Sequence, residues 1–109
     1  MLLLSSKHRP DAIFCFNDPS ALGAIRAIEE RGLRIPDDIA VAGCGNLPYG
    51  DLLRVPLTSV DQGSEEIGKR AATLALRLAF TKSRPAPKAQ LIEPKIVVRA
   101  SSLRSGSVS

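Results

Sequence analysis

The stretch from Ile13 to Gly32, IFCFNDPSALGAIRAIEERG, decides the fold of this chain. It opens with the end of an apolar run, residues 12–16, whose length is typical of a buried strand. From residue 19 onward, apolar residues recur every three or four positions, which predicts an amphipathic helix. Gly32 is typical of the residue that ends a helix in a left-handed conformation. The polar pair Asn17–Asp18 separates the two elements, although a plain turn needs only one capping residue there.

The alternation of strand and helix continues along the chain. Apolar runs predict strands at 39–43 and 57–60, and 91–94 and 95–101 are also strand-like. Residues 63–81 return to helical spacing, with Glu65–Lys69 and Glu66–Arg70 in the favoured i,i+4 order. A short helical turn is expected at 51–54, and 103–109 is expected to be a disordered tail. Short strands alternating with helices predict an α/β fold with a parallel sheet flanked by helices.

The composition limits the possible functions. The chain has 109 residues, the size of one domain, and a net charge of +4. The basic excess lies mainly in the second half, without a block of like charges and without interleaved aromatic residues. A dedicated nucleic-acid surface is therefore disfavoured. Cys15 and Cys44 lack metal-ligand spacing, which favours two buried thiols in a reducing compartment. The opening MLLLSSKHRP does not have the pattern of a secretory signal, and no apolar stretch is long enough to span a membrane.

Short polar side chains follow each of the first three predicted strands. Asn17 and Asp18 follow the first, Asn46 follows the second after Cys44 and Gly45, and Asp61 and Gln62 follow the third. Parallel strands end at one edge of a sheet, where α/β proteins bind ligands. One interpretation is that Asp18 caps the helix while Asn17 points into a cleft. The alternative, equally compatible with the pattern, is that both side chains only satisfy backbone groups of the turn.

No catalytic or metal-binding constellation is recognisable in the sequence. The single histidine, His8, is expected in a surface connection, and Ser20, Ser59 and Ser64 have no base that the pattern places beside them. Phosphate-binding glycine loops are also lacking. The sequence therefore predicts a protein that is not an enzyme and has no cofactor.

Several consecutive motifs resemble one family of bacterial regulators. They are the run NDPSALGAIRA, the run GLRIPDDIAVAG, and the later segments PLTSV and VVRAS. Together they resemble the C-terminal part of the lactose-repressor/galactose-repressor (LacI/GalR) family, over residues 9–102. The resemblance implies a partial lobe of the periplasmic-binding-protein-like (type I) fold. It also implies a cytoplasmic protein that senses a small sugar- or purine-like effector between two lobes and forms a homodimer.

The resemblance also implies roles for particular residues. Effector contacts are expected at Asn17, Asp18, Asn46 and Gln62. The family usually has an aspartate at the position of Gly45, and a glycine cannot supply that side-chain hydrogen bond; Asn46 and Tyr49 are the candidates to replace it. Dimer contacts are expected on the helix at 19–31 and on 49–53. The candidates are Leu22, Tyr49, Leu52 and Leu53, and for Leu22 a place in the core is favoured instead.

The resemblance implies an incomplete domain. Residues 1–62 and 95–102 would belong to the C-terminal lobe, while 63–94 would pack on an N-terminal lobe that this chain lacks. DNA would be bound only through a helix-turn-helix that is likewise missing. The stripe Ile67, Ala71, Leu74 and Leu78 is expected either to fold back on the sheet or to pack on a second chain. The alternative function is a fragment of a periplasmic sugar-binding protein of an ABC transporter, which shares the fold.

Overall fold

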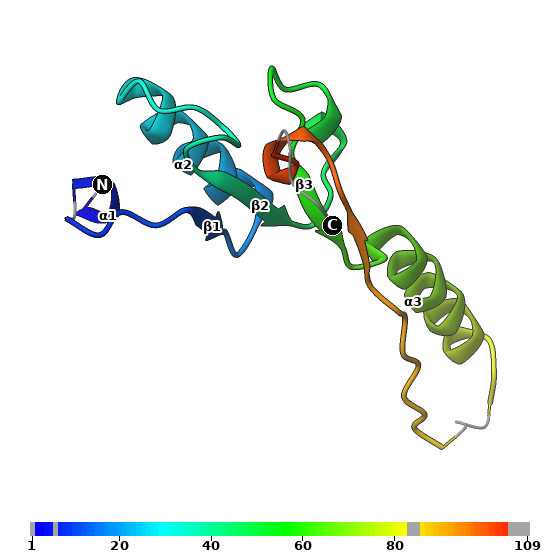
Figure 1. Cartoon of the computed structure of the whole chain (residues 1–109). Helices are drawn as coiled ribbons and strands as arrows, with labels where there is room; N and C mark the ends of the chain where they lie inside the picture. Colours follow the sequence, from blue (N-terminus) through cyan, green and yellow to red (C-terminus); the bar gives the residue numbers. More distant parts are fainter. Residues whose placement is uncertain (1, 6, 83–85, 105–109) are drawn as a thin grey trace.

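The computed structural model describes residues 2–5, 7–82 and 86–104. A four-stranded sheet carries one long helix on its face, and a second long helix extends away from it (Figure 1). In chain order, the elements are α1 (Leu2–Ser5), β1 (Ala12–Phe14), α2 (Asp18–Glu30), β2 (Ala40–Cys44), the 3-10 turn η1 (Pro48–Asp51), β3 (Thr58–Asp61), α3 (Ser64–Ala79), β4 (Lys95–Val97) and the 3-10 turn η2 (Ala100–Ser102).

The sheet has the order β1-β2-β3-β4. The first three strands are parallel, with Ile13 beside Val41 and Gly43 beside Ser59. This confirms the predicted α/β fold and parallel sheet, except that β4 runs antiparallel to β3. The reason is the path of the chain. It leaves β3 through α3 and returns to the same edge of the sheet instead of crossing back over it (Figure 1).

Helix α2 follows from the opening stretch. The Oδ1 atom of Asn17 accepts a hydrogen bond from the backbone N–H of Ser20 at 2.8 Å and so caps the first turn. At the other end, Gly32 adopts a left-handed backbone with φ of 72°. Its N–H donates to the carbonyl of Glu29, and the N–H of Leu33 donates to the carbonyl of Ile28. These two hydrogen bonds form a Schellman motif, which confirms the predicted role of Gly32.

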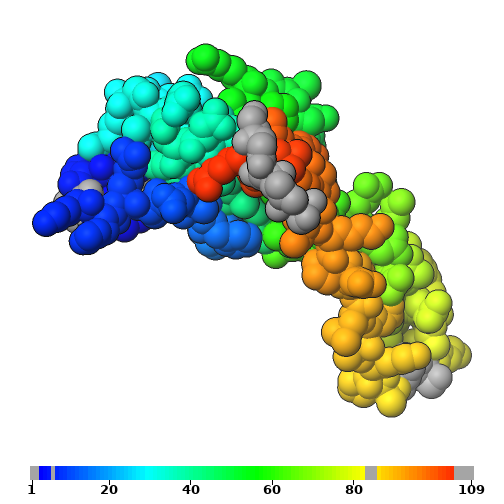
Figure 2. Space-filling model, viewed as in Figure 1, coloured from blue at the N-terminus to red at the C-terminus, as the bar shows by residue number. Residues whose placement is uncertain are grey.

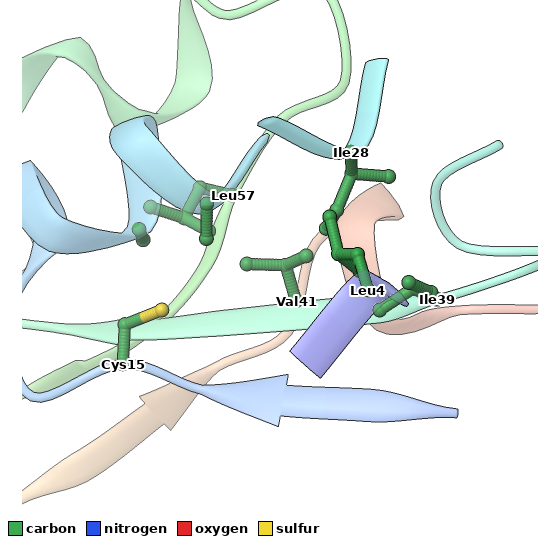
Figure 3. Close-up of a cluster of buried hydrophobic side chains, with 8 residues drawn as sticks. Leu4, Cys15, Ile28, Ile39, Val41 and Leu57 are labelled. Carbon is green, nitrogen blue, oxygen red and sulfur yellow. The ribbon is translucent and has the colours of Figure 1, made fainter. Parts of the chain in front are cut away.

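The hydrophobic core lies between α2 and one face of the sheet. Ile28 of α2 and Val41 of β2 are fully buried, together with Ile39 and Leu57. Figure 3 shows these side chains on the α2 side of β2, with Leu4 of α1 closing one end. Cys15 is buried in the same cluster, as predicted, whereas Cys44 is half-buried, and both thiols are free. The core therefore uses only one face of the sheet.

Helix α3 forms an arm outside this body (Figure 2). The radius of gyration is 18.9 Å, whereas a compact chain of this length would have about 13 Å. None of the sixteen residues of α3 is buried. The predicted ion pairs are present, Lys69–Glu65 at 3.5 Å and Arg70–Glu66 at 2.9 Å. Of the two alternatives for the apolar stripe, folding back on the sheet is wrong, because among the described residues the extended segment 86–94 is what runs beside this helix (Figure 1). Packing on a second chain stays a prediction.

Several predicted boundaries differ from the structure. Strands β2 and β3 each begin and end one residue later than predicted, and 91–94 is extended but unpaired. The helical turn after β2 is at Pro48–Asp51 instead of 51–54, because a proline suits the first position of a turn. In the predicted tail, Arg104 donates hydrogen bonds to the carbonyl oxygens of Pro36 and Asp11. Residues 105–109 lie outside the described residues.

Candidate functional site

The ends of β2 and β3 and the start of α2 meet at one open hollow of about 630 Å³. This volume is within the range of small-molecule sites. Two of the sequence-predicted effector residues that line it, Asn17 and Gln62, come from different strand ends, and Asn46 joins them from the loop after β2. The other lining residues are Pro19, Cys44, Gly45, Leu47, Pro48, Asp61, Ser64 and Glu65. The structure therefore brings three of the four predicted effector residues together at the carboxyl edge of the sheet.

The predicted cap is wrong, because Asn17 and not Asp18 caps α2, whereas Asn17 also lines the hollow as predicted. Asn17 is the helix cap, because its extended backbone lets its side chain reach the N–H of Ser20. Asp18 is instead the first helical residue and is completely buried. Its Oδ2 accepts from the N–H of Leu47 at 2.8 Å, and its Oδ1 accepts from the hydroxyl of Ser59 at 2.7 Å. Asp18 therefore ties the loop after β2 to β3 and does not line the hollow.

The buried carboxylate of Asp18 changes what the start of α2 offers to a ligand. A helix N-terminus favours a negative charge nearby. Here that position is taken by a side chain of the helix itself, which already accepts two hydrogen bonds. The free N–H groups of α2 are thus not an anion site, contrary to what the sequence suggests. Asn17, whose side chain is an amide, is the polar residue at the start of α2 that lines the hollow.

Asn46 bridges two groups of opposite charge. Its Nδ2 donates to Oδ2 of Asp61 at 3.1 Å, and its Oδ1 accepts from Nη2 of Arg99 at 2.9 Å. Arg99 also donates through Nη1 to the carbonyl of Leu57. The backbone N–H of Asn46 donates to the hydroxyl of Ser59, which links this bridge to Asp18. An amide is suited to this place because it presents a donor to the carboxylate and an acceptor to the guanidinium.

Asp61 is held in its charged form by its neighbours. The N–H of Gly63 donates to Oδ1 at 2.8 Å, and this bond is the main reason why the pKa of Asp61 lies below its usual value. The hydrogen bond from Asn46 lowers the pKa further. Asp61 is therefore a fixed negative charge at the rim of the hollow, between the end of β3 and the start of α3.

The loop after β2 has an unusual backbone. Gly45 has φ of 119° and Asn46 has φ of 50°, so two consecutive residues lie in the left-handed half of the map. An L-residue at position 45 would be strained in this conformation. Glycine at position 45 therefore allows a backbone conformation that other residues would adopt only with strain. Tyr49, a candidate to supply the side-chain hydrogen bond that a glycine cannot make, does not line the hollow.

The proposed dimer residues differ in accessibility. Leu52 directly follows η1 and is exposed, with 81% of its surface accessible. Leu22 and Tyr49 are half-buried, and Leu53 packs against the core. The hydroxyl of Tyr49 is buried with no hydrogen-bond partner among the described residues. Burial, followed by the charge of Asp18, raises the pKa of Tyr49.

Sequence reasoning places Asp61 at the ligand-binding edge without giving it a contact, and it does not single out Ser59 or Arg99 as site residues. Arg99 lies 53 residues from Asn46 in the chain, so no local spacing pattern connects them. Asp61 stands at a strand end, which by itself assigns it no role. The sequence feature that could have drawn attention to Arg99 is the motif VVRAS, which contains it. The motif does not show that Arg99 contacts Asn46.

Comparison with known proteins assigns the fold to a family. The periplasmic binding protein-like domain matches residues 2–102. The chain belongs to this family. The match covers both the sheet and α3, so the periplasmic-binding-protein-like fold inferred from the motifs is confirmed.

Relatives in this family are transcription regulators. The HTH-type transcriptional repressor PurR of Mannheimia succiniciproducens is 42% identical over 91% of this chain, which corresponds to 29% of that protein. A LacI-type transcription regulator from Bifidobacterium animalis has a TM-score of 0.86 and 31% identity, covering 93% of this chain and 36% of that one. A LacI family regulator from Enterococcus faecium with bound ribose has a TM-score of 0.81 and 28% identity, covering 93% and 37%. The resemblance to LacI/GalR regulators is thus confirmed.

The chain spans less than a third of the length of the Mannheimia repressor that it matches. In the part of the chain that the structure describes, no helix is long and apolar enough to cross a membrane. The same residues contain no group of three or more histidine, cysteine or acidic side chains that would hold a metal ion.

Proposed function

We propose that this chain is the C-terminal part of the effector-sensing core of a cytoplasmic LacI/GalR-type transcription regulator, and that it is not an enzyme. One observation supports the proposal most strongly. Asn17, Gln62 and the loop after β2 line one hollow at the carboxyl edge of the sheet, in a chain that matches the periplasmic binding protein-like domain. The relatives that it matches are regulators, so the transporter alternative has no comparable support.

The hollow would bind one side of a small polar effector. Asn17 and Gln62 present amide groups that donate to and accept from hydroxyl or ring-nitrogen groups. Asp61 adds an acceptor with a fixed negative charge. Asp18 and Asn46 would support the site indirectly, because their hydrogen bonds hold the loop after β2 in place. The second N–H of the Asn46 side-chain amide would be available to a ligand. A sugar-like effector is favoured, because a regulator of similar fold holds ribose.

Dimerisation of the regulator would use the surface around η1. Of the four candidates, Leu52 is the most exposed and is the best anchor for a contact. Leu53, Leu22 and Tyr49 would support it from partly buried positions. DNA would be bound through a helix-turn-helix outside this chain.

Titration with ribose, followed by amide chemical shifts, tests the effector site. This chain supplies only one side of a cleft, so we expect weak, millimolar binding, with shifts at Asn17, Gln62 and Gly45. Asn17→Ser keeps a capping oxygen but removes the amide nitrogen, so it should abolish the shifts while the helix stays capped. Shifts confined to residues far from the hollow would contradict the proposed site. Micromolar binding by this chain alone would contradict the two-sided cleft.

Binding to DNA tests the other part of the proposal. The chain should bind double-stranded DNA weakly and without sequence preference, and added salt should abolish that binding. Sequence-specific binding by the chain, measured by competition between unrelated duplexes, would contradict the proposal that this part of the regulator does not recognise DNA.

A further inference from the structure

The side-chain amide of Asn46 lies between two groups that cannot exchange roles. The guanidinium of Arg99 carries only donors, and the ionised carboxylate of Asp61 has only acceptors. Oδ1 of Asn46 accepts from Nη2 of Arg99 at 2.9 Å, and Nδ2 donates to Oδ2 of Asp61 at 3.1 Å. The reverse orientation would bring oxygen against oxygen and N–H against N–H. The two neighbours together therefore allow one orientation of the amide.

The guanidinium of Arg99 is itself held from two further sides. Its Nη1 donates to the carbonyl of Leu57 at 2.8 Å, and the backbone N–H of the same residue donates to Oγ1 of Thr58 at 2.8 Å. Gly50 leaves space for the guanidinium, because a Cβ there would be 3.1 Å from Nη1. Arg99 does not line the hollow, so its direct contact with the lining is Asn46.

The orientation of this amide decides what the hollow presents to a ligand. Asn46 and Asp61 both line the hollow. Nδ2 of Asn46 has a second N–H besides the one that Asp61 accepts, so a donor stands next to a carboxylate acceptor. A hydroxyl group can accept from the first and donate to the second, whereas a phosphate or carboxylate oxygen would face the charge of Asp61. Reversal of the amide would place two acceptors side by side and remove this match.

We propose that Arg99 is a positioning residue of the hollow, and that by fixing the Asn46 amide it selects effectors with a hydroxyl group at this point. The inference rests on the proposed effector-sensing function and adds the residue that sets the preference. The lowered pKa of Asp61 agrees with it, since the hydrogen bond from Gly63 and then that from Asn46 keep the carboxylate charged. A purely structural Arg99 would only hold the C-terminal segment on β3, which has different consequences for Asp61.

Titration of the Asp61 carboxyl group, followed by carbon NMR, tests the positioning role without any ligand. In Arg99→Met the amide is free to turn, so the pKa of Asp61 should rise. Asn46→Ala should raise it as well, and the double variant should raise it no further than Asn46→Ala alone. Ser102→Ala is the matched control, because it removes a hydrogen bond of the same segment, to Thr58 at 2.6 Å, without touching Asn46. The pKa of Asp61 should stay unchanged in that control.

Two results would overturn the positioning role. One is a pKa of Asp61 that Arg99→Met leaves unchanged. The other is an equal rise with and without Asn46, which would mean that the charge of Arg99 acts directly on the carboxylate. Circular dichroism checks that each variant is folded, and Arg99→Gln replaces Arg99→Met if that variant is not. An amide at position 99 both donates and accepts, so it no longer selects one orientation of Asn46.

Ribose titration, followed by amide chemical shifts, tests the selection of a hydroxyl-bearing effector. Arg99→Met should weaken ribose binding about fivefold, the effect of losing one typical hydrogen bond, and should have no further effect in Asn46→Ala. Sulfate, which only accepts, should cause no amide shift at Gly45 in the wild type. Unchanged ribose affinity in Arg99→Met, or sulfate shifts as large as those with ribose, would overturn the selection. Absence of ribose shifts in the wild type would count against the proposed effector site, while the Asp61 titration would still decide whether Arg99 positions Asn46.

Discussion

Gly43 of β2 lies directly against the carboxylate of Asp18. A Cβ at residue 43 would be 2.3 Å from Oδ1 of Asp18 and 3.3 Å from Cβ of Ala21. The absence of a side chain on β2 thus creates the space in which a charged group is buried at the start of α2. The position of the loop that lines the hollow depends on this carboxylate, because it accepts hydrogen bonds from the N–H of Leu47 and the hydroxyl of Ser59.

Gly43→Ala should therefore destabilise the protein. The new methyl group must displace either Asp18 or the first turn of α2, and overpacking of this kind costs about 3 kcal/mol. Gly23→Ala is the matched control, because a Cβ there meets nothing within 4 Å. In the middle of α2 it should raise the free energy of unfolding by about 0.5–1 kcal/mol. Urea denaturation of both variants measures the difference, and equal stabilities would show that the Gly43 contact is not tight.

Asp18→Asn should cost about 2 kcal/mol in free energy of unfolding. The amide keeps one acceptor for the N–H of Leu47, but its nitrogen can only donate, so the hydroxyl of Ser59 loses the acceptor that Oδ1 of Asp18 supplies. One buried donor then lacks an acceptor. Amide hydrogen exchange should show faster exchange at Leu47 and Asn46 than in α2. Unchanged protection of these two amides would mean that Asp18 does not hold the loop.

Asn46→Asp should make stability depend on pH in the opposite sense to the wild type. In the wild type the pKa of Asp61 is lowered, so its contribution is present above the unfolded value near 4 and is lost on acidification. In the variant, two carboxylates face each other, which raises the pKa of the pair. Stability should then fall as pH rises from about 4 to 7, measured by thermal denaturation.

The double variant Asn46→Asp/Asp61→Asn serves as the control for this reversal. It restores one donor and one acceptor across the contact, and the carboxylate introduced at position 46 would still accept from Arg99. Most of the stability at pH 7 should return, so that the two substitutions are strongly non-additive. If the losses in stability of the two single variants simply add in the double variant, the contact between residues 46 and 61 contributes nothing to stability.

Tyr49→Phe should leave the free energy of unfolding unchanged at pH 7 or raise it by up to about 1 kcal/mol. The hydroxyl is buried without a partner among the described residues, so its removal loses no hydrogen bond there. Burial raises the pKa of Tyr49 in the folded state, so the wild type should lose stability as pH rises above about 10, the unfolded value. The phenylalanine variant should lose less, as denaturation at pH values of about 9 and about 11 would show. A loss above about 1 kcal/mol at pH 7 would instead reveal a partner for the hydroxyl.

Local sequence was sufficient to predict most of the elements. The spacing of apolar residues located α2 and α3, and Gly32 marked the end of α2, because helix periodicity and termination depend on neighbours within a few residues. The ends of the first three strands were predicted to within one or two residues, and their shared edge followed from the parallel order. The hollow was therefore placed correctly from the sequence, and three of the four predicted effector residues line it.

Tertiary structure alone decided what each polar residue does. Asn17 and Asp18 are both good capping residues, and only the space above Gly43 shows which one is buried. Asn46 joins Asp61 and Arg99 across 15 and 53 residues, a contact that no local pattern encodes. The direction of α3 depends on how the chain returns to β4, and hence on long-range pairing. Secondary structure is set by short-range periodicity, whereas these roles depend on which distant groups share a buried space.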